Sequence, residues 1–215
     1  MLGLSPGGLT VLALGAHADD IELGCGGTLL TLAGRPGTLL HSVVLTGAPQ
    51  RAAEAQAAAR AVDALSFQAL GLPDGRLPGR WEQVKDVLEE IAEDITPDLV
   101  LAPRPDDAHQ DHRTLAEVVP TVFRAAMVLG YEIHKQDGDR GPCNVYVPLS
   151  ASTLQAKWEL IDEYFPSQRG RDWWDLEVVA GLARLRGVEA RTRYAEGFWC
   201  HRVILDLGPG GAGCG

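Results

Sequence analysis

The sequence predicts an α/β protein with a Rossmann-like, mostly parallel sheet, helices on both faces of that sheet, and a C-terminal α+β extension. Short, unbroken apolar runs at residues 10–16 and 99–102 are typical of strands buried on both faces, and residues 38–46 are predicted to form a further strand. Segments with helical spacing separate these runs. Strands that alternate with helices imply βαβ crossovers and therefore a parallel sheet.

The first half of the chain alternates regularly. Residues 10–16 form the first predicted strand, and a loop over residues 17–24 leads to a short helix at 28–33, which Gly34 and Pro36 end. A second strand at 38–46 precedes an Ala-rich helix at 51–65. A third strand at 67–70 runs into the Leu-Pro-Asp-Gly turn at 72–75.

Residues 81–95 have apolar side chains at positions 84, 87, 88, 91 and 95, which is the spacing of an amphipathic helix. Residues 99–102 form the fourth strand. A polar loop then reaches residue 112, and the next helix is predicted at 115–126.

The pattern changes after residue 127. Strands are predicted at 128–133 and 144–147, and a capping box at residues 152–155 opens a helix that reaches residue 165. A helix at 175–186 and a last strand at 198–207 complete the extension. The glycine-rich tail, 208–215, has nothing to bury and is expected to be disordered. We therefore predict a single domain over 1–207, with a Rossmann-like core at 1–127 and a substrate-side extension at 128–207.

The composition excludes several classes of partner. The 215 residues include 19 Lys and Arg against 29 Asp and Glu, a net charge of −10, whereas nucleic-acid binding depends on clustered cations. No charge-free apolar stretch approaches the ~20 residues of a membrane span, so we expect no membrane insertion. The N-terminus lacks a charged signal-peptide region, and the four cysteines form no C-x-x-C pair. These features favour a reduced, cytoplasmic protein; a homo-oligomer stays open.

Two clusters of imidazoles and carboxylates follow predicted strands. His17-Ala-Asp19-Asp20 comes directly after the first strand, and the loop after the fourth contains Asp106, Asp107, His109, Asp111 and His112. The carboxyl ends of parallel strands share one edge of the sheet, where ligands bind in such folds. Three ligands of this kind and an open fourth position are the pattern of a catalytic zinc site. Amide cleavage would also require a base and a donor to the oxyanion.

Other interpretations of the same residues exist. Asp19 or Asp20 could simply cap the following helix, and residues 109–112 could be a solvated loop. Gly24-Cys-Gly-Gly27 suggests a dinucleotide fingerprint, but Leu29 stands where G-x-G-x-x-G requires its third glycine. We interpret these glycines as a flexible loop that allows close packing.

The motifs resemble those of the PIG-L-like (LmbE-like) N-acetylglucosaminyl deacetylases: His17-Ala-Asp-Asp20, Gly24-Cys-Gly-Gly-Thr28, His109-Gln-Asp-His112 and Tyr194-Ala-Glu-Gly-Phe198. The resemblance implies a metal-dependent hydrolase, with Zn²⁺ or Fe²⁺, in which metal-bound water removes the acetyl group from an N-acetyl amino-sugar conjugate. One departure is Ala18, where the family usually has proline; alanine does not fix φ, so we expect retained ligation with a slightly looser loop.

The resemblance also implies residue roles. The metal ligands would be His17, Asp20 and His112, and the general base would be Asp19. His109 would face the oxyanion as a cation and protonate the leaving amine, with Asp111 tuning it. After the second and third strands, the family pattern matches Arg51 with Glu54 and Asp74, and we expect Arg51 and Asp74 to bind sugar hydroxyls. If Asp19 is not the base, Asp106 or Asp107 is the next candidate.

The group attached to the sugar cannot be deduced from the sequence. Trp173, Trp174 and Trp199 could form a stacking platform, although such residues are more often core or interface residues. Tyr131-Glu-Ile-His134 and Arg169-Gly-Arg171 are candidates for the rim of the site. Two other functions stay open: a Rossmann-like nucleotide-binding redox domain, and a catalytically silent metal- or sugar-binding module.

Overall fold

Seven strands form one sheet in the computed structural model, which describes residues 7–204. The strand order is β3-β2-β1-β4-β5-β7-β6. The first five strands in chain order pair in parallel, and β7 is antiparallel to both of its neighbours. This confirms the predicted mostly parallel α/β fold. The strands are β1 (Thr10–Gly15), β2 (Leu39–Thr46), β3 (Ser66–Leu72), β4 (Leu99–Pro103), β5 (Met127–Tyr131), β6 (Val145–Leu149) and β7 (Tyr194–Trp199).

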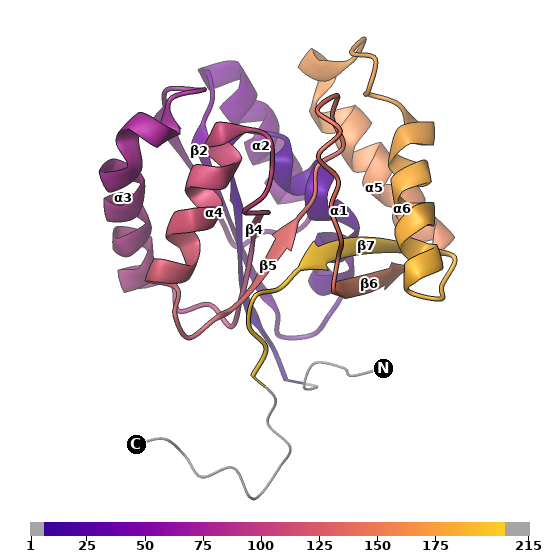
Figure 1. Cartoon of the computed structure of the whole chain (residues 1–215), viewed down its shortest axis with the longest axis horizontal. Helices are drawn as coiled ribbons and strands as arrows, with labels where there is room; N and C mark the ends of the chain where they lie inside the picture. The colour runs from indigo at the N-terminus through magenta and orange to yellow at the C-terminus, as the bar shows by residue number, and fades with distance from the viewer. Residues whose placement is uncertain (1–6, 205–215) are drawn as a thin grey trace, which may run out of the picture.

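Helices cover both faces of the sheet (Figure 1). One face packs against α1, α2 and α5, the other against α3 and α4, and α6 packs on β7. The helices are α1 (Asp20–Ala33), α2 (Pro49–Ala61), α3 (Trp81–Asp94), α4 (Gln110–Val122), α5 (Ala151–Tyr164) and α6 (Leu176–Glu189), with short 3₁₀ turns at Leu77–Arg80 and Pro166–Gln168.

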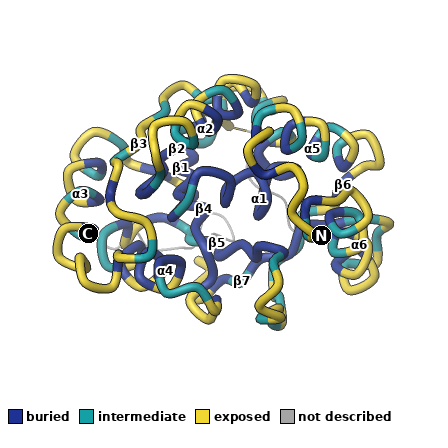
Figure 2. The backbone as a smooth tube through the Cα atoms, turned by 90° about the horizontal axis from the view of Figure 1, so that it is seen from above, coloured by how far each residue is buried: buried dark blue, intermediate teal, exposed yellow. Residues whose placement is uncertain are grey.

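The central strand β1 shows why the strands are continuously apolar. Val11 and Ala13 pack into the core on one side of the sheet, and Leu12 and Leu14 pack into the core on the other. Seen from above, the central strands are buried between two layers of helices whose outer surfaces are exposed (Figure 2). Both faces of the strand therefore exclude water, so no polar alternation appears in the sequence.

Two helices begin earlier than predicted. α1 starts at Asp20, so the predicted loop at 17–24 is wrong from residue 20 onward. The helix is kinked at Cys25 (φ −141°, ψ 22°). The glycines lie within this helix because they pack closely: a Cβ at Gly24 would stand 2.2 Å from the Tyr131 ring, and one at Gly27 2.7 Å from Leu149. The fourth helix, α4, starts at Gln110 rather than residue 115.

The C-terminal strand also differs from its prediction. β7 covers Tyr194–Trp199, whereas the sequence placed it at 198–207. Residues 205–207 and the tail predicted to be disordered, 208–215, lie outside the described residues. Within residues 7–204, no helix is long and apolar enough to cross a membrane.

Candidate metal and active site

The two sequence clusters meet between β1 and β4. These strands are neighbours at the centre of the sheet, where the chain order of the strands reverses, and ligands bind at such switch points. A cleft of about 440 Å³ opens there, within the ~300–1,000 Å³ of small-molecule sites. Of the residues predicted to share this edge, five line the cleft: His17, Asp19, Asp20, His109 and His112. Asp106, Asp107 and Asp111 are not among its lining residues.

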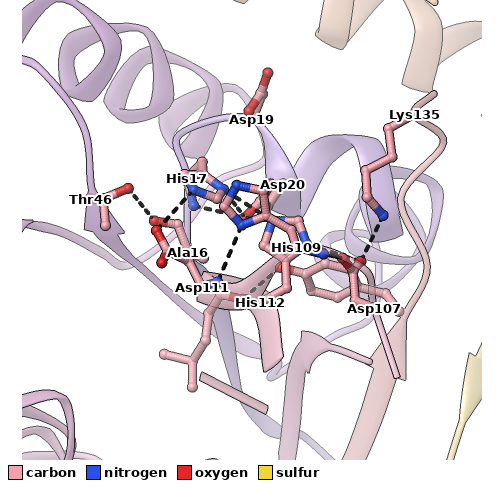
Figure 3. A network of polar contacts seen from close by, with 12 residues as sticks. Ala16, His17, Asp19, Asp20, Thr46, Asp107, His109, Asp111, His112 and Lys135 are labelled. Atoms are coloured by element: carbon pink, nitrogen blue, oxygen red, sulfur yellow. Dashed lines mark hydrogen bonds and ion pairs between the residues drawn. The ribbon is translucent and has the colours of Figure 1, made fainter. Parts of the chain in front are cut away.

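Three of these residues converge on one point. His17 Nδ1 lies 3.0 Å from His112 Nε2 and 3.3 Å from Asp20 Oδ2, and His112 Nε2 lies 3.2 Å from the same carboxylate oxygen. Asp20 is oriented by the backbone N–H of His17, which donates to Oδ2 at 2.7 Å. Figure 3 shows the two rings and the carboxylate gathered at the centre of the polar network.

The spacing of these atoms fits a metal ion. Tetrahedral zinc with bonds of about 2.0–2.1 Å separates its ligand atoms by roughly 3.3–3.4 Å. The His17, Asp20 and His112 atoms, at 3.0–3.3 Å, are close to that spacing. The nitrogens of His17, His109 and His112 also lie within 4.8 Å of one another. We prefer Asp20 as third ligand because its Oδ2 lies 3.3 Å from His17 Nδ1 and 3.2 Å from His112 Nε2, close to the spacing of zinc ligands.

Further carboxylates lie behind the two rings, within ion-pair distance of their other nitrogens. His112 Nδ1 faces Asp107 Oδ2 at 3.0 Å, and Lys135 Nζ lies 3.0 Å from the same oxygen. His17 Nε2 faces Asp74 at 3.2 Å and Asp111 at 3.5 Å. A histidine ligand typically presents its other nitrogen to a carboxylate, which fixes the ring and raises its basicity. The sequence identified Asp107 only as a substitute base and gave no signal for Lys135.

The charges of the cluster are strongly coupled. Burial disfavours a proton on both His17 and His112, but the negative charge of Asp20 outweighs this effect. The pKa of His17 is raised to about 9. The pKa of His112, which also faces Asp107, is raised to about 10. Burial opposes the charge of Asp20 as well, yet the two rings hold its pKa well below the usual range. A dication that replaces the two ring protons would meet the same carboxylate.

His109 stands at the N-terminus of α4. Its ring lies edge-on to His17, with centroids 4.6 Å apart. Its Nδ1 accepts the backbone N–H of Asp111 at 3.2 Å, so Nε2 carries the proton of the neutral ring. Burial and the charges of His17 and His112 lower the pKa of His109. The buried Asp111 carboxylate accepts N–H groups of Gly75 and Leu77, which ties the loop after β3 to this site.

Asp19 belongs to a second network. Its carboxylate points away from the three rings (Figure 3) and forms an ion pair with Arg51 at 2.8 Å. Burial raises the pKa of Asp19, against the effect of Arg51. Arg51 also binds Glu54 at 2.8 Å and the Ser167 hydroxyl at 3.0 Å, and Glu54 accepts both N–H and O–H of Ser167. Through Glu54, the loop after α5 therefore contacts the Asp19 network.

Some of the residues predicted to contact substrate line the cleft, and others lie outside it. Asp74, with a side chain 71% exposed, and Arg51 both line the cleft; their role as sugar contacts stays a prediction. Of the three tryptophans, only Trp173 lines the cleft. Trp174 is buried and packs against Phe165, while Trp199 stacks on His201 outside the cleft. The cleft also includes His134 and Arg171.

Comparison with known proteins places the chain in a family. Residues 12–123, just over half of the chain, match the family described as PIG-L: GlcNAc-PI de-N-acetylase. The chain therefore belongs to the PIG-L family of deacetylases. One relative is the protein described as uncharacterized deacetylase YaiS of Escherichia coli (strain K12). It is 32% identical over 135 residues, which cover 57% of this chain and 72% of YaiS.

Solved structures share the fold. The N,N'-diacetylchitobiose deacetylase from Pyrococcus horikoshii superposes with a TM-score of 0.71 at 22% identity, over 89% of this chain and 83% of that one. GalB, the 4-carboxy-2-hydroxymuconate hydratase from Pseudomonas putida KT2440, superposes with a TM-score of 0.71 at 20% identity, over 93% and 99%. The two carry out different reactions, so the fold alone does not determine the chemistry.

Proposed function

We propose that this protein is a metal-dependent N-deacetylase that hydrolyses the acetamide of an N-acetyl amino-sugar conjugate. The observation that carries the proposal is the convergence of His17 Nδ1, Asp20 Oδ2 and His112 Nε2, 3.0–3.3 Å apart in a cleft that also includes Asp19 and His109. Zn²⁺ or Fe²⁺ suits these imidazole and carboxylate donors. A bound ion would polarise the acetyl carbonyl and lower the pKa of water.

Asp19 acts as the proton acceptor in this proposal. A base works best with a pKa near the working pH, and burial raises the pKa of Asp19 in that direction. Arg51 holds the carboxylate at the wall of the cleft at 2.8 Å. Arg51 therefore positions Asp19, a role in addition to the sugar contact expected from the sequence. The Arg51–Glu54–Ser167 contacts keep the guanidinium itself in place.

His109 is the proposed donor to the oxyanion and to the leaving amine. The N–H of Asp111 occupies its Nδ1, so the Nε2 proton is the one available to substrate. His109 is also not needed as a ligand, since His17, Asp20 and His112 already supply the three protein ligands of a catalytic site. An acid and a base acting together predict a bell-shaped pH profile of kcat/KM.

The deciding experiment measures acetate release from a panel of N-acetylglucosamine conjugates by the metal-loaded protein. Asp19→Asn and His109→Gln should each lower kcat by roughly 10²–10⁴ with metal content unchanged. His41→Gln is the matched control, because His41 lies on β2 and bonds Ser66, outside the cleft. A metal-loaded wild type that binds these conjugates without releasing acetate would instead be the silent module. The cytoplasmic location stays a prediction.

A further inference from the structure

The cleft is divided by charge. Its acidic part holds Asp19, Asp20 and Asp74 near the proposed metal ligands. Another part, which we call the basic wall, comes from the segment after β5 and from the connection between α5 and α6. It contains no carboxylate among its described lining residues. The basic wall consists of Ile133, His134, Lys135, Gln168, Arg171 and Trp173.

Arg171 is the unpaired cation of this wall. The other cleft cations are engaged: Arg51 pairs with Asp19, and Lys135 with Asp107 and Asp139. Arg171 has no carboxylate within ion-pair distance among residues 7–204, and its guanidinium lies 6.0 Å from the centroid of the Trp173 ring. A guanidinium over an aromatic face at this distance is attracted to the ring, and such a contact leaves its N–H groups free to bind an anion.

His134 adds a buried polar group to the same wall. It is 2% exposed, and its Nε2 has no hydrogen-bond partner among the described residues. Its ring meets the edge of Trp173, with centroids 6.0 Å apart. Burial and three nearby cations lower the pKa of His134 to about 3, so the ring is neutral and offers one donor and one acceptor. A buried imidazole without a protein partner calls for another hydrogen-bonding group.

We propose that the basic wall is the subsite for the group attached to the acetylated sugar, and that this group carries a carboxylate or phosphate bound by Arg171. The inference rests on the proposed function and names its substrate class. A chain of net charge −10 repels anions at long range, so an anionic substrate needs a local cation. Arginine suits this role because its fork of N–H groups matches carboxylate and phosphate oxygens. Trp173 would pack on the attached group beside Arg171.

The test compares matched N-acetylglucosaminides whose attached group ends in a carboxylate, a phosphate or the neutral methyl ester of that carboxylate. The wild-type, metal-loaded protein should favour at least one anion over the ester by about tenfold in kcat/KM, as one charge-assisted hydrogen bond gives. Added salt should reduce that preference. Arg171→Gln should abolish this preference, mainly by raising KM for the anionic substrates, and should change kcat/KM for the ester less than for them.

Arg169→Gln is the control variant, because Arg169 is two residues away and pairs with Asp162 rather than lining the cleft. Trp173→Ala should weaken the binding of all three substrates to the same extent. Equal kcat/KM for anionic and neutral substrates would overturn the inference while leaving deacetylation intact. Calorimetric measurement of substrate binding tests the subsite separately if the proposed deacetylase function is wrong. If no substrate is hydrolysed, but the anionic conjugates bind and Arg171→Gln abolishes that binding, the proposed function is wrong and the subsite stands.

Discussion

Replacing Glu196 should destabilise the protein strongly, because this buried carboxylate on β7 holds the kinked helix α1. Its Oε1 accepts the N–H of Gly27 at 2.9 Å, and its Oε2 accepts the N–H and O–H of Thr28, both at 2.6 Å. The kink at Cys25 leaves these N–H groups at the start of the second half of the helix, where a negative charge is favourable. Lys157 completes the arrangement, 2.6 Å from Oε1.

The magnitude follows from burial. The side chains of Lys157 and Glu196 are 7% and 4% exposed, so solvent screens the pair little. Removing one partner of a buried ion pair costs about 3–5 kcal/mol, since the other charge stays buried without compensation. Glu196→Gln should therefore lower the free energy of unfolding by about 3–5 kcal/mol, a large part of the ~5–15 kcal/mol of a typical domain. Combining it with Lys157→Met should cost less than the two single changes together.

Urea denaturation followed by circular dichroism measures these differences at equal metal loading. The control is Glu159→Gln on the exposed face of α5, which should change the free energy of unfolding by less than about 0.5 kcal/mol. A Glu196→Gln protein within about 1 kcal/mol of wild type would refute the assignment of Glu196 as the anchor of α1. Strict additivity of the two single changes would refute the coupling to Lys157.

Three further predictions concern the site. The pKa values of His17 and His112 are raised to about 9 and 10, so metal binding near pH 7 should release about two protons and weaken as the pH falls. Calorimetry in buffers of different ionisation enthalpy would detect the proton release. A metal affinity that does not depend on pH would contradict the prediction. Asp107→Asn should weaken metal binding about 10–100-fold by releasing the His112 ring, and an unchanged affinity in a chelator competition would rule this out. Arg51→Ala should shift the acidic limb of the kcat/KM profile to higher pH, because Arg51 opposes the raised pKa of Asp19; an effect confined to KM would identify Arg51 as a substrate contact only.

The sequence by itself determined the architecture and the identity of the acid and imidazole clusters. Strands covered on both faces are continuously apolar, so β1 and β4 could be recognised locally. Parallel crossovers then place the residues after both strands at one edge, which is why His17 and His112, 95 positions apart, meet at 3.0 Å. The predicted helix starts were wrong where packing decided them. Glycine is a poor helix former, yet Gly24 lies within α1, at a position where only a residue without Cβ fits against Tyr131.

Only the tertiary structure decided which side chains pair. Nothing local predicts that Asp107 faces His112 across a turn of the chain, or that Lys135 joins them. The same holds for Glu196, which reaches α1 from 168 positions away. Periodicity reports which face of an element is buried, because burial repeats along the chain. A hydrogen bond between distant residues depends instead on the register and crossing of several elements, and it leaves no repeating signal in the sequence.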